Sequence, residues 1–213
     1  MIRPDILLYD WDDTLVDCWS AIASAMNAAF AAFGMPPWSK EEVRARARRS
    51  LRDAFPDLFG SDWMRAREIF YARLEEEHLS ALSAKPGVEA LLEVGKAWPQ
   101  GVVSNKSGSV LRREIAHLRW QDRFGIAIGS GDASADKPDP APLRMALAAL
   151  APRSGGHAWY IGDSAIDMKA ARAAGFTAVL LGNAEHDGGV ESLSPDLHAP
   201  DAAALAALLR KIA

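Results

Sequence analysis

A short apolar run near the start of the chain, residues 5–9, ends in the acidic sequence Asp10-Trp11-Asp12-Asp13. Such a run is typical of a buried parallel strand. Side chains alternate along a strand, so we expect Asp10 and Asp12 on one side and Trp11 on the other. Carboxylates at the carboxyl end of a strand can hold a cation and supply acid and nucleophile groups. A solvated turn accounts for the same residues, because Asp is a common turn residue.

Five short apolar runs predict strands, at about 5–9, 101–104, 125–129, 158–162 and 177–181. Between and after them, apolar residues recur at helical spacing in segments 88–92, 110–118, 142–150, 166–174 and 201–212. Gly175 is expected to cap the end of one helix and Asp201 the start of the last. Alternation of strands and helices predicts βαβ units and a doubly wound parallel sheet.

The segment 17–84 breaks this alternation. It contains no convincing strand, and its patterns predict helices at about 19–33, 43–49 and 63–79, the second opened by a capping box from Ser39 to Glu42. We therefore expect an all-helical domain, residues 17–84, inserted into an α/β core made of residues 1–16 and 85–213. Hinges are expected near Asp17 and at Lys85-Pro86-Gly87.

Polar residues follow two of the later apolar runs. One run ends in Ser104 and another leads into Asp163, and between them Lys137 directly precedes a proline. In this order, the four segments resemble the four signature motifs of the haloacid dehalogenase superfamily. Each motif alone is weak, but their order and spacing together are specific and cover nearly the whole chain. The resemblance implies a Rossmann-like core with an inserted helical cap.

The first segment matches the pattern of a hydrophobic strand followed by DxD-x-T-L, except that Asp13 stands where glycine is commoner. Asp tolerates left-handed backbone better than most residues, so the departure affects a turn rather than a catalytic group. The resemblance implies that Asp10 is the nucleophile and a metal ligand. Asp12 would bind the metal through its backbone carbonyl and act as general acid, then base. Thr14 would steady the turn, although an ordinary hydroxyl turn explains it equally well.

The resemblance also implies roles for the later motifs. Asp163 would complete a Mg²⁺ site with Asp10 and Asp12, since magnesium prefers a few carboxylates plus substrate phosphate. Lys137 would neutralise Asp10 and the transferring phosphoryl group. Asp167 would orient metal-bound water or Lys137, while a favourable charge near a helix start is an equal alternative.

Ser104 would bind phosphate together with backbone N–H groups at the start of the following helix. Simple N-capping is the alternative explanation. Asn105 and Lys106 would contact the substrate, and Ser104-Asn105-Lys106 is similar to the phosphoglycolate phosphatase variant of this motif. In the predicted cap, Arg52 occupies the region where the family places a substrate-specificity loop.

The predicted function is therefore a Mg²⁺-dependent phosphatase acting on a small phosphorylated metabolite. A phosphomutase would use the same nucleophile, and the motifs do not exclude it. A dehalogenase would also use Asp10, but such enzymes lack an acid at the position of Asp12. A non-catalytic binding module would be expected to lose Asp10, Lys137 or Asp163, and all three are present.

Composition limits the partners. The formal net charge of −4 argues against general binding to nucleic acid or to a membrane surface. The single cysteine, Cys18, excludes an intramolecular disulfide and fits a reducing compartment. With neither a signal-peptide pattern nor a long apolar span in view, we expect a cytoplasmic protein. The oligomeric state is not readable from the sequence.

Overall fold

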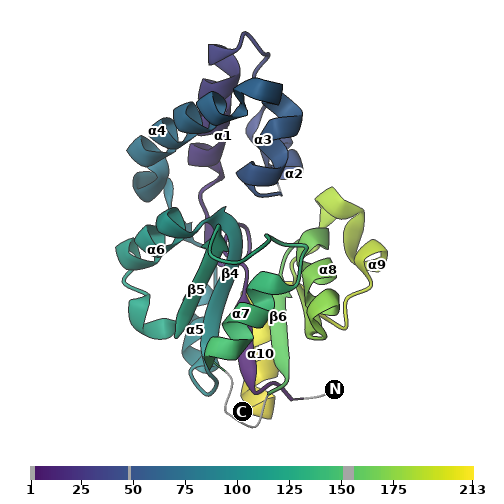
Figure 1. The fold of residues 1–213 in the computed structure, drawn as a ribbon. Coiled ribbons are helices and arrows are strands. Elements are labelled where there is room, and N and C mark those ends of the chain that lie inside the picture. Colours follow the sequence, from purple (N-terminus) through teal and green to yellow (C-terminus); the bar gives the residue numbers. More distant parts are fainter. Residues whose placement is uncertain (1–2, 48, 151–155) are drawn as a thin grey trace. The chain divides into compact units, whose positions relative to one another are not determined.

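The computed structural model describes residues 3–47, 49–150 and 156–213, and two compact units are present. One unit comprises Met1–Val16 and Ala84–Ala213, and the other is Asp17–Ser83 (Figure 1). The connecting segments β2 (Val16–Asp17) and β3 (Ser83–Ala84) form a two-stranded sheet. Residue 48, which belongs to the predicted basic helix, lies outside the described residues.

In the described part of the chain, six parallel strands form one sheet in the order β5-β4-β1-β6-β7-β8. Their bounds are β1 (Ile6–Tyr9), β4 (Gln100–Ser107), β5 (Ile126–Ser130), β6 (Ala158–Gly162), β7 (Thr177–Leu181) and β8 (Leu197–Ala199). The doubly wound parallel sheet is confirmed. β1 and β6 lie in the middle of the sheet, where every residue is buried, which explains their uninterrupted apolar sequences.

The five predicted strands are present, with two differences. β4 continues to Ser107, beyond the predicted end at Ser104, and its pairing with β5 shifts after Val103. Three short strands were not predicted: β2, β3 and β8. The central residue of β8, His198, is polar, so the three residues of β8 do not form an apolar run.

Helices cover both faces of this sheet. They are α5 (Val88–Gly95), α6 (Gly108–His117), α7 (Ala141–Leu150), α8 (Ala165–Ala174), α9 (Gly189–Leu193) and α10 (Ala202–Ile212). One core joins Leu143 of α7 and Met168 of α8 to the sheet residues Leu8, Tyr160 and Leu180. α5 and α10 pack together, and Figure 1 shows them on the opposite side of the sheet from α7.

Both predicted caps of this unit are confirmed. Gly175 ends α8 in the left-handed region, with a φ of 80°, and its N–H donates to the carbonyl of Arg172 at 3.0 Å. Asp201 begins α10, where its carboxylate accepts a hydrogen bond from the N–H of Ala204 at 2.8 Å.

Between Asp17 and Ser83, which belong to β2 and β3, the described residues of the second unit form helices and the turns that join them. This unit contains α1 (Trp19–Ala32), α2 (Lys40–Arg46), α3 (Leu51–Phe59) and α4 (Trp63–Ala81). The capping box that opens α2 is confirmed: Glu42 N–H donates to Ser39 Oγ at 3.1 Å, and Ser39 N–H donates to the Glu42 carboxylate at 2.9 Å.

The loop expected around Arg52 was wrong, because Arg52 lies in helix α3. Pro56 lies inside this segment, and because proline removes a backbone donor, the sequence does not predict a helix here. Aromatic side chains that pack against one another stabilise the helix despite the proline. Phe55 and Phe59, one turn apart, contact each other, and Phe55 also contacts Phe70 of α4.

Among the described residues, no helix combines the length and the apolar character needed to cross a membrane. The cytoplasmic location stays a prediction.

We expect Asp201→Ala to lower the free energy of unfolding by about 1 kcal/mol, because the first turn of α10 loses its cap. Asp201→Asn keeps an accepting oxygen at the same place and should lie within a few tenths of the native value. Urea denaturation of the three proteins measures the difference. Equal losses for Ala and Asn would contradict the capping role.

Candidate active site

The strand ends that carry the predicted site residues are neighbours in the sheet. β4, β1 and β6 lie side by side and run parallel. Asp10 follows β1, Ser104 lies in β4 and Asp163 follows β6, and all three are buried. Parallel strands end at the same edge, so these side chains gather at the carboxyl edge of the sheet.

Lys137 joins this edge into one charged network. Its Nζ donates to Oδ1 of Asp10, to Oδ1 of Asp167 and to the hydroxyl of Tyr160, each at 2.7 Å. The Lys137 side chain is only 3% exposed. A buried ammonium is stable only when it is paired and hydrogen-bonded, and these three acceptors meet that requirement.

Asn105 holds the segment that carries Lys137. Its Oδ1 accepts from the Lys137 N–H and its Nδ2 donates to the Lys137 carbonyl, both at 2.9 Å. The sequence predicted Asn105 at the substrate. In the structure, this amide binds the backbone of the lysine, so it positions the cation of the site. A contact between Asn105 and the substrate stays a prediction.

Ser104 does not cap the helix that follows it. α6 begins at Gly108 with Ser107 at the N-cap position. The Ser104 hydroxyl accepts a hydrogen bond from the N–H of Lys106 at 3.1 Å, within the same segment. The N-capping explanation of Ser104 is therefore excluded, and its hydroxyl lies at the same strand edge as Asp10.

Three carboxylates form an acidic cluster beside Lys137. Oxygens of Asp10, Asp163 and Asp167 all lie within 4.8 Å of one another. The Thr14 hydroxyl lies 3.1 Å from Oδ1 of Asp163 and 3.5 Å from Oδ2 of Asp10, so it bridges the two acids. A set made only of oxygen donors suits a hard divalent cation such as Mg²⁺. The residues present therefore fit such an ion.

Burial and charge set the protonation of this cluster. Burial raises the pKa of Asp10 to about 7, and the Lys137 ammonium opposes part of that rise. Burial alone would raise the pKa of Asp167, but Lys137 and hydrogen bonds from Ser164 outweigh it and lower that pKa. Burial alone would lower the pKa of Lys137, but Asp10 and Asp167 raise it above its ordinary value. Lys137 is thus a fixed cation at neutral pH.

Asp167 serves both roles that the sequence left open. It lies in the first turn of α8, where it accepts hydrogen bonds from the Ser164 N–H at 3.1 Å and the Ser164 hydroxyl at 2.6 Å. Its other oxygen binds Lys137. Gly162 makes room for it, because a Cβ there would lie 2.4 Å from the Cβ and Cγ of Asp167. Glycine before Asp163 is therefore required by close packing.

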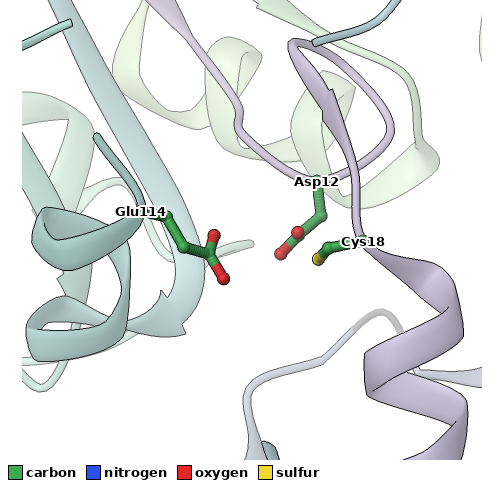
Figure 2. A group of neighbouring side chains, drawn as sticks. All are labelled: Asp12, Cys18 and Glu114. Atoms are coloured by element: carbon green, nitrogen blue, oxygen red, sulfur yellow. The ribbon is translucent and has the colours of Figure 1, made fainter. Parts of the chain in front are cut away.

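Asp12 belongs to a separate group of charges at this edge. Its Oδ1 accepts from Lys106 Nζ at 2.8 Å, and the same ammonium donates to Oε2 of Glu114 at 2.7 Å. Figure 2 shows the carboxylates of Asp12, on the loop after β1, and Glu114, on α6, projecting toward one another. The Asp12 carboxylate therefore lies against Lys106 rather than with the carboxylates of the acidic cluster.

Asp13 adopts the left-handed conformation, with a φ of 67°. Its carboxylate accepts from Lys85 Nζ at 2.9 Å, and Lys85 also contacts the Asp13 carbonyl. The Lys85 N–H donates to the carbonyl of Leu15 at 3.0 Å. The side chain that replaces the commoner glycine is thus used to attach residues 13–15 to the segment at Lys85.

Sequence reasoning missed Tyr160, His186 and Glu114. Tyr160 lies inside an apolar strand, and its hydroxyl donates to the Val103 carbonyl at 2.8 Å while it accepts from Lys137. His186 Nε2 lies 3.8 Å from Oδ2 of Asp163. No motif marks these residues. A charged Glu114 among the apolar positions of its helix was the one available signal.

Sequence comparison identifies the family of this chain and two similar proteins. Residues 7–181 match the sequence profile of the haloacid dehalogenase-like hydrolase family. The phosphoglycolate phosphatase of Photorhabdus laumondii is 30% identical over 185 residues, which cover 82% of this chain and 79% of that protein. The phosphoglycolate phosphatase of Xylella fastidiosa strain 9a5c is also 30% identical, over 83% of this chain and 80% of that protein.

Solved structures share the fold. A predicted phosphoglycolate phosphatase from Haemophilus somnus 129PT superposes with a TM-score of 0.82 and 21% identity, covering 100% of both chains. A haloacid dehalogenase-like family hydrolase from Streptococcus pneumoniae superposes with a TM-score of 0.80 and 21% identity, covering 99% of both. At this level of identity, the likeness concerns the fold.

Asp10→Asn should change the pH dependence of stability in the metal-free protein. Native Asp10 keeps its proton up to about pH 7, whereas an unfolded Asp loses it at about pH 4. Between these values the native state binds more protons, so the contribution of Asp10 to the free energy of unfolding falls as pH rises. The stability of Asp10→Asn relative to native protein should therefore increase from about pH 4 to about pH 7.

Urea denaturation in excess chelator, repeated across this pH range, measures the effect. Asp122→Asn is the matched control, because Asp122 is an exposed acid of the same unit. A constant difference between Asp10→Asn and native protein across the range would contradict the raised pKa of Asp10.

Proposed function

Because the chain belongs to the haloacid dehalogenase-like hydrolase family, we propose that it hydrolyses a small phosphorylated metabolite through an aspartyl-phosphate on Asp10. The chain is a phosphatase of this family. The main support for an aspartyl-phosphate on Asp10 is the buried pair of Asp10 and Lys137, which lies among the carboxylates of Asp163 and Asp167. A nucleophile beside a fixed cation is what a dianionic phosphate ester requires.

Lys137 and the strand-edge groups would bind the phosphoryl group. Lys137 would contact its oxygens and oppose the charge that spreads over them as the ester bond breaks. Ser104 and backbone N–H groups at the start of α6 would contact the remaining oxygens. Asn105 supports this arrangement through its two hydrogen bonds to the Lys137 backbone.

Magnesium would be held by the carboxylates of Asp10 and Asp163 and by the backbone carbonyl of Asp12. Thr14 would orient the two carboxylates and Asp167 would lie beside them, as their contacts support. When bound, the cation would neutralise phosphate charge near Asp10 and so permit two anions to approach.

The reaction would proceed in two displacements. A carboxylate oxygen of Asp10 bonds to phosphorus while the bond from phosphorus to the ester oxygen breaks, and Asp12 donates its proton to that oxygen. Asp12 then takes a proton from water, whose oxygen attacks phosphorus and breaks the bond to Asp10. Inorganic phosphate leaves, Asp10 is again a carboxylate, and Asp12 again carries the proton that it donates in the next cycle.

Phosphoglycolate is the first substrate to test, because relatives with 30% identity over most of the chain carry that activity in their names. The sequence Ser104-Asn105-Lys106 supports the same choice. A direct contact between Lys106 and substrate stays a prediction, since its ammonium is held by Asp12 and Glu114.

The helical unit is proposed as a cap that moves about the segments near Asp17 and Lys85–Gly87. The support is its position as an insertion between β1 and β4 and its separation as a compact unit. A cap would exclude bulk water and strengthen electrostatic interactions with the phosphoryl group. It would also limit substrate size.

We expect hydrolysis of small phosphate monoesters to require Mg²⁺ and to stop in excess chelator. A panel of phosphoglycolate, sugar phosphates, nucleotides and an aryl phosphate, read by phosphate release, measures this. Full turnover in chelator would overturn the metal assignment. Transfer of the phosphoryl group to a second sugar hydroxyl, without phosphate release, would show a phosphomutase.

Asp10→Asn should abolish turnover while circular dichroism remains native, because the nucleophile is lost. Asp12→Asn should slow turnover by roughly 10²–10⁴-fold, the usual effect of losing a general acid and base. Asp122→Asn, an exposed acid in the same unit, should have native activity. Near-native turnover by Asp10→Asn would replace the covalent mechanism with direct attack of water.

Arg52→Ala should raise KM for the preferred metabolite or change the preference, and it should barely alter hydrolysis of a small aryl phosphate. The reason is that a cap arginine would contact the part of the substrate beyond the phosphate. Arg44→Ala, another exposed arginine of the helical unit, is the control. Equal loss on every substrate would mean that Arg52 supports the fold.

A further inference from the structure

Glu114 is a carboxylate with no exposed surface, placed on the buried side of α6. Its companions on that side are apolar or small: Gly108, Val110, Leu111 and Ile115. A buried carboxylate is unfavourable unless it is paired and hydrogen-bonded, and an apolar residue would suit this side of the helix better. Its presence therefore needs an explanation beyond packing.

Two contacts of Glu114 reach the catalytic segments. Oε2 accepts from Nε1 of Trp11 at 2.6 Å and from Nζ of Lys106 at 2.7 Å. Trp11 stands between Asp10 and Asp12 in the chain, and Lys106 follows Ser104 by two residues. One oxygen atom on a third element thus ties the loop after β1 to the end of β4.

Lys106 carries this connection to Asp12. Its ammonium donates to Oδ1 of Asp12 at 2.8 Å. The side-chain exposure rises along the chain of contacts, from 0% at Glu114 to 6% at Lys106 and 18% at Asp12. Asp12, the most exposed of the three, is the residue that would contact the substrate. Lys106 and Glu114 are more buried and hold the Asp12 carboxylate in place.

We infer that Glu114 is a positioning residue that fixes the general acid Asp12 through Lys106. The inference rests on the proposed function, in which Asp12 donates its proton to the ester oxygen as that oxygen leaves phosphorus. Lys106, held by Glu114, stays in place to pair the Asp12 carboxylate that this transfer produces. Without Glu114, the ammonium would have one anchor fewer and Asp12 would lose its fixed orientation.

Leaving-group dependence separates this role from a structural one. A good leaving group, such as a nitrophenolate, departs from phosphorus without a proton, whereas an alkoxide needs one. A misplaced general acid therefore slows alkyl esters selectively. A damaged fold slows both kinds of ester equally. The constant kcat/KM is the right measure because it includes the first displacement.

The test compares kcat/KM for benzyl phosphate and for p-nitrophenyl phosphate in native protein and in Glu114→Gln, because these two esters have similar shapes and differ mainly in the leaving group. We expect the variant to lose roughly 10–100-fold on the benzyl ester and less than about 3-fold on the nitrophenyl ester. Glu89→Gln is the matched control, since its carboxylate is exposed on α5. Equal losses on both esters would overturn the inference. If native protein releases phosphate from no monoester of the panel, the proposed function itself fails, and the inference falls with it.

Lys106→Met and the double variant Lys106→Met/Glu114→Met complete the test. The double variant removes the Glu114 carboxylate together with the ammonium that pairs it, so neither is left buried without the other. It should show the same selective loss on benzyl phosphate, and circular dichroism checks that it is folded. Because Glu114 acts through Lys106, adding Glu114→Met to Lys106→Met should cause no further selective loss; independent, multiplicative losses would contradict the connection.

Discussion

The ammonium of Lys137 is the interaction on which the rest of this site depends. Asp10 and Asp167 lie buried within bonding distance of it, and Tyr160 completes its set of acceptors. Two carboxylates at one dry strand edge would repel each other strongly without a cation between them. The fold supplies that cation from a segment distant in sequence and holds its backbone with Asn105. A stable acidic edge is therefore possible before any ligand binds.

The site still carries an excess of negative charge. Asp163 adds a third carboxylate within 4.8 Å of the other two, and burial, together with the charge of Asp167, raises the pKa of Asp10 to about 7. Such an arrangement opposes folding, and chains retain conflicts of this kind where function requires them. A divalent cation would relieve the repulsion. In the second group, Lys106 binds the carboxylates of both Asp12 and Glu114, so the Asp12 carboxylate has a cation of its own.

Local signals in the sequence were strong enough to predict most of the architecture. Central strands such as β1 and β6 are buried on both faces, so their apolar runs are continuous and easily read. Capping residues such as Asp201 and Gly175 act on their own helix, so sequence spacing suffices to find them. Helix α3 was missed because Pro56 argues against a helix locally, while aromatic contacts with α4 decide in its favour. The short edge strand β8 has too little apolar sequence to be seen.

The sequence by itself determined that Asp10 and Asp163 directly follow apolar strands and that Ser104 belongs to a third, and the shared direction of parallel strands brings the three to one edge of the sheet. Only the tertiary structure decided their partners. The sequence predicts only a core role for Tyr160, and its place beside the site depends on the pairing of β6 with β1. In the same way, the sequence places Glu114 on a helix, but its contact with Trp11 depends on how α6 packs against the loop after β1. Hydrogen bonds between residues far apart in sequence depend on how elements pack, and no local pattern records that packing.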